Sequence, residues 1–119
     1  MSRLDWGIGN QYIESIKFTM SNGDVSPKYG VKIITDFCLF ESPINKILMY
    51  VADRRLVGLT FYTEHDGEFL VITAPKLSVG TTMHELVYSE TLLGFNMRVA
   101  DKSLQGMSIN IASSNEIIQ

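Results

Sequence analysis

Short apolar and alternating segments recur along the chain, and their pattern predicts β-strands. Residues 12–20, YIESIKFTM, alternate in character, with Ile16, Phe18 and Met20 on one side. Further apolar segments are rich in β-branched and aromatic residues, namely 44–51, 56–63, 68–73 and 107–112. Turn-forming residues separate these segments, as in SNGD and EHDG. The sequence therefore predicts an all-β fold of many short strands, such as a sandwich, barrel or prism.

One segment, residues 81–95, also has helical features. Thr82 and Glu85 have the spacing of a capping box, and Met83 and Val87 recur at helical spacing. We predict a strand here nonetheless, because the second half of the segment favours β structure and ends in an apolar run.

Internal repeats accompany this pattern. Three segments align and place a polar side chain at the same position: Glu14 in residues 12–20, Asn45 in residues 43–51 and Gln105 in residues 103–111. The segments 56–62 and 92–98 also match, with Gly58 and Gly94 in register. Three copies of about forty residues each have room for a small antiparallel sheet. The repeats predict pseudo-threefold symmetry.

Composition and charge narrow the class of protein. The 119 residues fit one domain, and 45% of them are hydrophobic while 19% are charged, as in globular chains. The net charge of −3 argues against nucleic-acid binding driven by phosphate contacts. The amino terminus lacks an apolar leader, and no window approaches the ~20 apolar residues of a membrane span. We therefore expect an intracellular, cytoplasmic protein.

Candidate chemistry for an enzyme is sparse. The one cysteine, Cys38, lies between apolar residues and is expected to be a small buried hydrophobe. The cluster TEHDGE (63–68) contains the hairpin-turn dipeptide Asp66–Gly67 and matches neither zinc nor calcium spacing. We predict no catalytic residues, no metal site and no cofactor.

The aligned segments resemble the jacalin-related lectin domain. The resemblance runs from about Gly7 to Ile111 and rests on GNQYIESIKF, ESPINKI, LVGLTFYT, GTTMHEL and LLGFNMRVADKSLQGMSINI. It implies one β-prism domain over residues 1–119, built from three antiparallel Greek-key sheets, with residues 1–6 and 113–119 as terminal extensions. It also implies a non-catalytic carbohydrate-binding module, of the mannose or glucose type.

The resemblance implies two candidate sugar-binding loops. The family's Gly-x-x-x-Asp loop precedes its last strand and corresponds to Asp101, Lys102, Ser103, Leu104 and Gln105. A second loop in the first Greek key corresponds to Asn10, Gln11, Tyr12, Ile13 and Glu14.

The first of these loops departs from the family pattern. Gln105 stands where the family has an aspartate, and Asp101 stands where it has a glycine. Hydrogen bonds to charged groups contribute roughly 1.5–3 kcal/mol, against about 1 for neutral ones, and a millimolar sugar site totals only about −4 kcal/mol. We therefore expect the 101–105 loop to be impaired, and Tyr12 and Glu14 to mark the better candidate site.

Other interpretations stay open. Glu14, Asn45 and Gln105 could be ordinary solvent-facing residues at strand starts. Tyr12 and Trp6 could stack on a sugar ring or cover the end of the core. Typical family members carry an additional strand and a Gly-rich loop before Tyr12, for which residues 7–9 are a short substitute and 113–119 a possible replacement strand. The protein could also be a lectin-derived scaffold that binds other proteins, as a homodimer or in a larger assembly.

Overall fold

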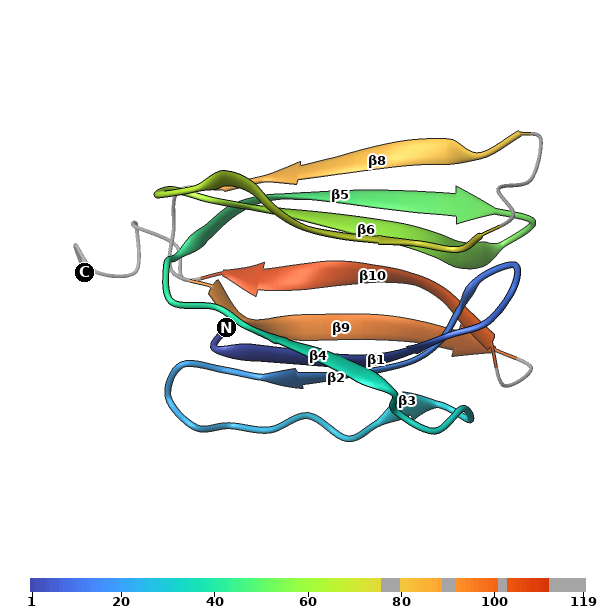
Figure 1. Ribbon diagram of the computed structural model, residues 1–119, viewed down its shortest axis with the longest axis horizontal. Helices are drawn as coiled ribbons and strands as arrows, with labels where there is room; N and C mark the ends of the chain where they lie inside the picture. Colours follow the sequence, from blue (N-terminus) through green and yellow to red (C-terminus); the bar gives the residue numbers. More distant parts are fainter. Residues whose placement is uncertain (76–79, 89–91, 101–102, 112–119) are drawn as a thin grey trace.

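The computed structural model describes residues 1–75, 80–88, 92–100 and 103–111. It is all-β, as predicted, and consists of three antiparallel sheets (Figure 1). The strands are β1 (Arg3–Ile8), β2 (Ile13–Thr19), β3 (Tyr29–Gly30), β4 (Asp36–Leu39), β5 (Ile44–Ala52), β6 (Arg55–Thr63), β7 (Gly67–Thr73), β8 (Thr82–Val87), β9 (Leu92–Ala100) and β10 (Ser103–Ile111). Within the described ranges, no helix is long and apolar enough to cross a membrane.

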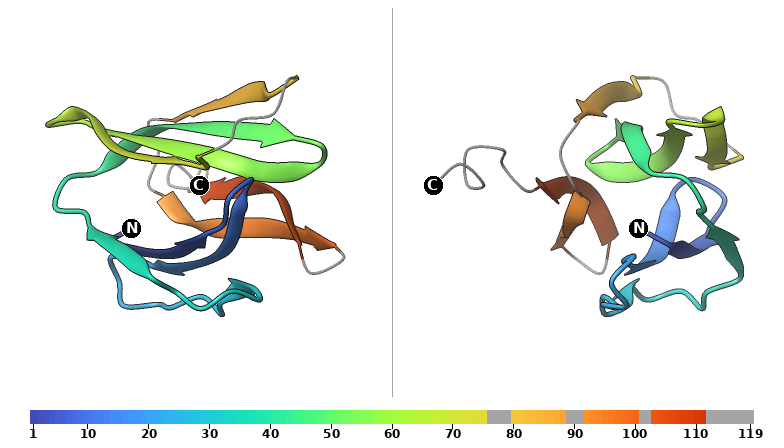
Figure 2. Two further views of the ribbon diagram at one scale, coloured as in Figure 1. Left: turned by 45° about the vertical axis from the view of Figure 1, so that its right-hand side comes forward. Right: turned by 90° about the vertical axis from the view of Figure 1, so that its left-hand side faces the viewer.

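Two of the sheets have the same topology. The strand order is β3-β2-β1-β4 in the first sheet and β7-β6-β5-β8 in the second, and both are Greek keys whose fourth strand returns beside the first. The third sheet has the order β10-β9. Viewed along the strands, the three sheets surround a common centre (Figure 2, right).

Each sheet contains a hairpin with a β-bulge near the start of one strand. In β1–β2, Ile8 faces Ile13 and Gly7 faces Ser15, so Glu14 is an extra residue that forms a β-bulge beside the turn. In β9–β10 the extra residue Gln105 also lies beside the turn, whereas in β5–β6 the extra residue Asn45 lies near the start of β5, at the open end of the hairpin. The polar positions that align in the sequence are therefore bulge residues near the start of a strand in each sheet.

A second irregularity is shared by the two later hairpins. β6 has an extra residue, Val57, immediately before Gly58, and β9 has Leu93 immediately before Gly94. Between their two bulges, the hairpins β5–β6 and β9–β10 pair residue for residue in the same register. The strand with the polar bulge residue is the first strand in β5–β6 and the second strand in β9–β10. The sequence match between Gly58 and Gly94 reflects this shared register.

The bulge changes which side chains of β2 enter the core. Strict alternation would place Ile13 on the opposite side from Ile16, but the extra residue Glu14 returns Ile13 to the core side, and both isoleucines are fully buried. The residues before the other two bulges, Ile44 and Leu104, are also buried.

One hydrophobic core joins the three sheets. Phe18 of β2, in the first sheet, stacks on Phe95 of β9, in the third sheet, with a centroid separation of 4.2 Å. Phe40, just after β4, meets Phe61 of β6 edge-on at 5.6 Å. The core therefore depends on side chains far apart in the sequence.

Three expectations need comment. The segment 1–6 is not a terminal extension, because Arg3–Ile8 forms β1, an interior strand that pairs with β2 and β4. The strand expected within 81–95 is confirmed as β8. Cys38 is half-buried on β4 rather than fully buried, and burial raises the pKa of its thiol. Residues 113–119 lie outside the described ranges.

The β5–β6 turn suggests a stabilising substitution. Asp53 and Arg54 both have positive φ, 51° and 60°, as a two-residue type I′ turn requires. An arginine in this conformation costs roughly 1–2 kcal/mol, which glycine avoids in exchange for its larger unfolded-state entropy. We expect Arg54→Gly to raise the free energy of unfolding by about 0.5–1 kcal/mol in urea denaturation. Arg54→Ala, the control, should give no such gain.

Tyr88 leads to a second stability prediction. This residue is 7% exposed, its hydroxyl has no hydrogen-bond partner in the described part of the chain, and burial raises its pKa to about 12. Since the unfolded hydroxyl titrates near about 10, stability should fall as the pH rises from about 10 towards 12. We expect Tyr88→Phe to stabilise the protein by about 1 kcal/mol at pH 7 and to reduce the alkaline loss, measured by urea denaturation. A less stable variant at pH 7 would show that the hydroxyl has a partner.

Candidate functional site

The turn between β1 and β2 forms the base of the candidate site. The N–H of Gly9 donates to the carbonyl of Tyr12 at 2.9 Å, which closes the turn. A Cβ at Gly9 would collide with the Glu14 carboxylate, so glycine is needed for that side chain to lie against the turn. A Cβ at Gly30 of β3, which has a φ of 89°, would likewise collide with the backbone carbonyl of Glu14. The bulged residue is thus held between two glycines.

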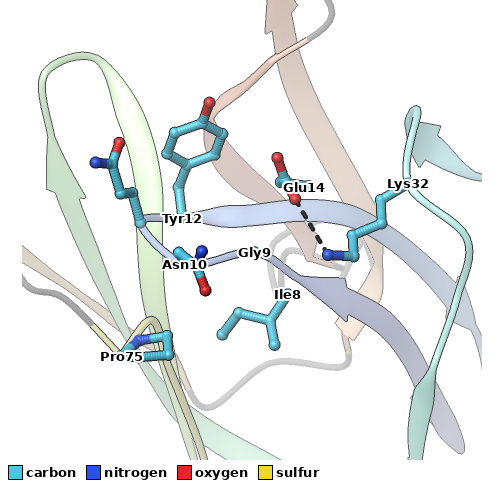
Figure 3. Close-up of a pocket in the computed structure, with 8 residues that line it drawn as sticks. Ile8, Gly9, Asn10, Tyr12, Glu14, Lys32 and Pro75 are labelled. Carbon is cyan, nitrogen blue, oxygen red and sulfur yellow. Dashed lines mark hydrogen bonds and ion pairs between the residues drawn. The ribbon is translucent and has the colours of Figure 1, made fainter.

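A pocket of about 480 Å³ lies over this turn (Figure 3). Its lining residues come from the turn and from two distant parts of the chain: Ile8, Gly9, Asn10, Gln11, Tyr12, Glu14, Lys32 and Pro75. Figure 3 shows the Glu14 side chain directed toward Lys32, with Tyr12 in the turn just before the strand that carries Glu14. The structure therefore brings together Asn10, Gln11, Tyr12 and Glu14.

The charged groups of the pocket form one weak ion pair. Glu14 Oε2 lies 3.4 Å from Lys32 Nζ, and both side chains are about a third exposed, at 34% and 37%. The carboxylate can accept and the ammonium can donate hydrogen bonds, and the exposed amides of Asn10 and Gln11 offer both. This set suits a neutral, polyhydroxylated ligand.

The aromatic candidates take different positions. The guanidinium of Arg55, from the start of β6, lies 4.6 Å from the centre of the Tyr12 ring. Tyr12 is half-buried and is one of the residues that line the pocket. Trp6 packs against the core instead and does not line this pocket.

The second predicted loop lies elsewhere. Asp101 and Lys102 fall outside the described residues, and Ser103, Leu104 and Gln105 form the start of β10 rather than a loop. The Leu104 side chain is fully buried in the core, so it is unavailable to a ligand.

Gln105 lines a different pocket, of about 390 Å³, between the second and third sheets. Its walls include Met49, Met107 and His84, and the Met107 N–H donates to Met49 Sδ at 3.3 Å. Gln105 and Glu14 thus occupy equivalent bulges but do not share a site. The third bulge residue, Asn45, lines a hollow of about 380 Å³ with Lys46 and Tyr62.

Sequence reasoning missed two contributors to the pocket. Lys32 follows β3 and Pro75 follows β7. Neither residue lies in a motif, and only the sheet topology brings them to the turn. For Ile8 and Gly9 a signal exists, because residues 7–9 are a short substitute for the Gly-rich loop of the lectin domain that the sequence resembles.

The ion pair of the pocket should contribute little to stability. We expect Lys32→Met to lower the free energy of unfolding by less than about 1 kcal/mol, because the pair is partly exposed. Arg3→Met is the control: Arg3 pairs with Asp5 at 2.9 Å, and Asp5 is buried, so this variant should lose more. Urea denaturation of both variants checks the order, and an equal loss would indicate that the Glu14–Lys32 pair is structural.

Comparison with known proteins adds no assignment. No protein-family model matches the chain, and no match is found among curated proteins or among solved structures. The function is therefore inferred from the residues themselves.

Proposed function

We propose that the protein is a non-catalytic carbohydrate-binding module of the jacalin-like β-prism type, which binds sugar at the turn between β1 and β2. The observation that carries the proposal is the pocket that gathers Asn10, Gln11, Tyr12 and Glu14, together with Lys32. A pyranose presents hydroxyls that both donate and accept, and an apolar ring face. The pocket offers a carboxylate, an ammonium, two amides and an aromatic ring.

The repeated hairpins support the prism part of the proposal. Each of the three sheets has a β-bulge near the start of one strand and contributes to one core, as we expect of a threefold prism. Two sheets have the Greek-key order expected of every sheet of such a prism.

Among the equivalent bulge positions, the first is the best suited to hold a sugar. Glu14 is charged, whereas Asn45 and Gln105 are neutral amides with one acceptor oxygen each. Hydrogen bonds to a carboxylate contribute roughly 1.5–3 kcal/mol, which is a large part of the total for a weak monosaccharide site. We assign sugar binding to Glu14 and its surroundings, with mannose or glucose as the first ligands to examine.

A glycan array tests the proposal, followed by titration calorimetry with the best ligand. We expect the parent protein to bind, and Glu14→Gln to weaken binding by at least about tenfold, because the amide loses the charge-assisted acceptor. The matched control is Gln105→Ala, at the equivalent bulge of the third sheet, which should bind like the parent. Loss of binding in the control alone would assign the site to β10 instead. If the parent protein binds no glycan on the array, sugar binding is rejected.

A second candidate is a lectin-derived scaffold that has lost sugar binding. The observation that favours it is the setting of Gln105, which lies on a strand and not in a polar loop, in a pocket that three methionines line together with polar residues: Met49, Met97, Met107, His84, Asn96, Arg98 and Ser108. If the folded protein binds no glycan on the array, this scaffold function is favoured.

A further inference from the structure

In the described part of the chain, the third sheet has two strands, whereas each of the other two has four. Within the described residues, β9 and β10 pair only with each other, whereas the equivalent hairpins β1–β2 and β5–β6 have a further strand on each side. The strand equivalent to β9 is β1 in the first sheet, where β4 pairs with it, and β6 in the second, where β7 pairs with it.

Residue equivalences locate the open edge. Phe95 and Met97 of β9 correspond to Leu59 and Phe61 of β6, which face Ile72 and Leu70 of β7. In the first sheet the corresponding residues are Leu4 and Trp6, which face Cys38 and Asp36 of β4. An antiparallel strand therefore occupies this position in both complete sheets.

The backbone of β9 presents hydrogen-bonding groups at this edge. Met107 lies opposite Met97, yet the Met107 N–H donates to Met49 Sδ and so points away from β9. Opposed residues in an antiparallel pair either exchange both bonds or neither, so the N–H and C=O of Met97 point away from β10. By alternation, those of Phe95 and Val99 point the same way. The same contact shows that the outer edge of β10 abuts the second sheet at Met107.

The β9 edge also lacks the usual protection against pairing. The other sheets end in β3, which has two residues, or in strands that carry a carboxylate: Asp36 in β4, Glu68 in β7 and Glu85 in β8. β9 has nine residues and one charged side chain, Arg98. A Cβ at Gly106 would lie 3.5 Å from the Arg98 guanidinium, so this charge lies over β10 and not at the outer edge.

Exposed apolar side chains accompany this edge. Leu93 is 56% and Val99 is 43% exposed, and both lie on β9. Apolar side chains at both ends of an unprotected edge strand mark a surface that gains from being covered.

We propose that β9 is a dimerisation edge, and that its partner is β9 of a second copy of this chain. Antiparallel pairing about a twofold axis would give the order β10-β9-β9-β10, which is four strands, as in each of the other two sheets. Two β9 strands can pair without charge repulsion, because β9 carries no carboxylate and its one cation, Arg98, lies over β10 of the same copy. This inference is independent of sugar binding, because the pocket lies on the first sheet.

Sedimentation velocity on the full chain tests the assembly. We expect a dimer of the 13.4 kDa chain at about 100 μM, dissociating on dilution. Val99→Lys should raise the dimer Kd by at least about tenfold, because it places like charges on both sides of the new pairing. The matched control is Val71→Lys, an exposed valine on the edge strand β7, which should leave the Kd unchanged. Circular dichroism of each variant confirms that the fold is retained.

Hydrogen exchange identifies the edge that pairs. The amides of Phe95, Met97 and Val99 should be protected at high protein concentration and exchange faster on dilution, while those of β7 should not change. A protein that is monomeric at about 100 μM would overturn the proposal, as would a dimer in which the β9 amides exchange freely or Val71→Lys alone dissociates it. These outcomes leave the glycan-array result untouched, so the two proposals fail separately.

Discussion

The β-bulge near the start of one strand in each sheet is the constraint on which the core and the surface both depend. An extended strand sends successive side chains to opposite faces, so a buried residue and its second neighbour normally share a side. One extra residue shifts this pattern and lets Ile13 enter the core with Ile16, while Glu14 stays at the surface. The same shift places Leu104 inside and Gln105 at a pocket wall. A single local irregularity thus produces both a buried anchor and a directed polar side chain.

The chemistry of the candidate site comes from what surrounds the bulge in each sheet. Around Glu14, two glycines allow the backbone to approach closely, and Lys32 supplies a partner charge. Around Gln105 three methionines share the pocket wall with polar side chains such as His84 and Arg98. Equivalent backbone geometry therefore supports different surface chemistry, because a bulge directs a side chain but does not determine its neighbours. Function in such a repeat belongs to individual sites rather than to the fold.

The proposed β9 interface and the proposed binding pocket lie on different sheets. A dimer formed through β9 would leave the turn between β1 and β2 open in both copies, so it would carry two equivalent pockets. Two linked weak sites can bind a multivalent surface far more strongly than one site alone. An incomplete third sheet would then contribute to function by making the module bivalent, which a closed monomer would not achieve.

The sequence by itself determined the all-β class, most of the strand segments and the polar positions of the repeat. These features are local: alternation, β-branched residues and turn dipeptides act within a few residues, and the segments 44–51 and 56–63 predicted β5 and β6 for that reason. The first strand was missed because RLDWGI is short and interrupted by Asp5 and Gly7, so its interior place reflects pairing with β2 and β4 and not its own pattern. Only the tertiary structure decided that Glu14 is bulged, that Lys32 and Pro75 reach the same pocket, and that Leu104 is buried. Each of these depends on strand register and on contacts between distant segments, which no local pattern of residues encodes.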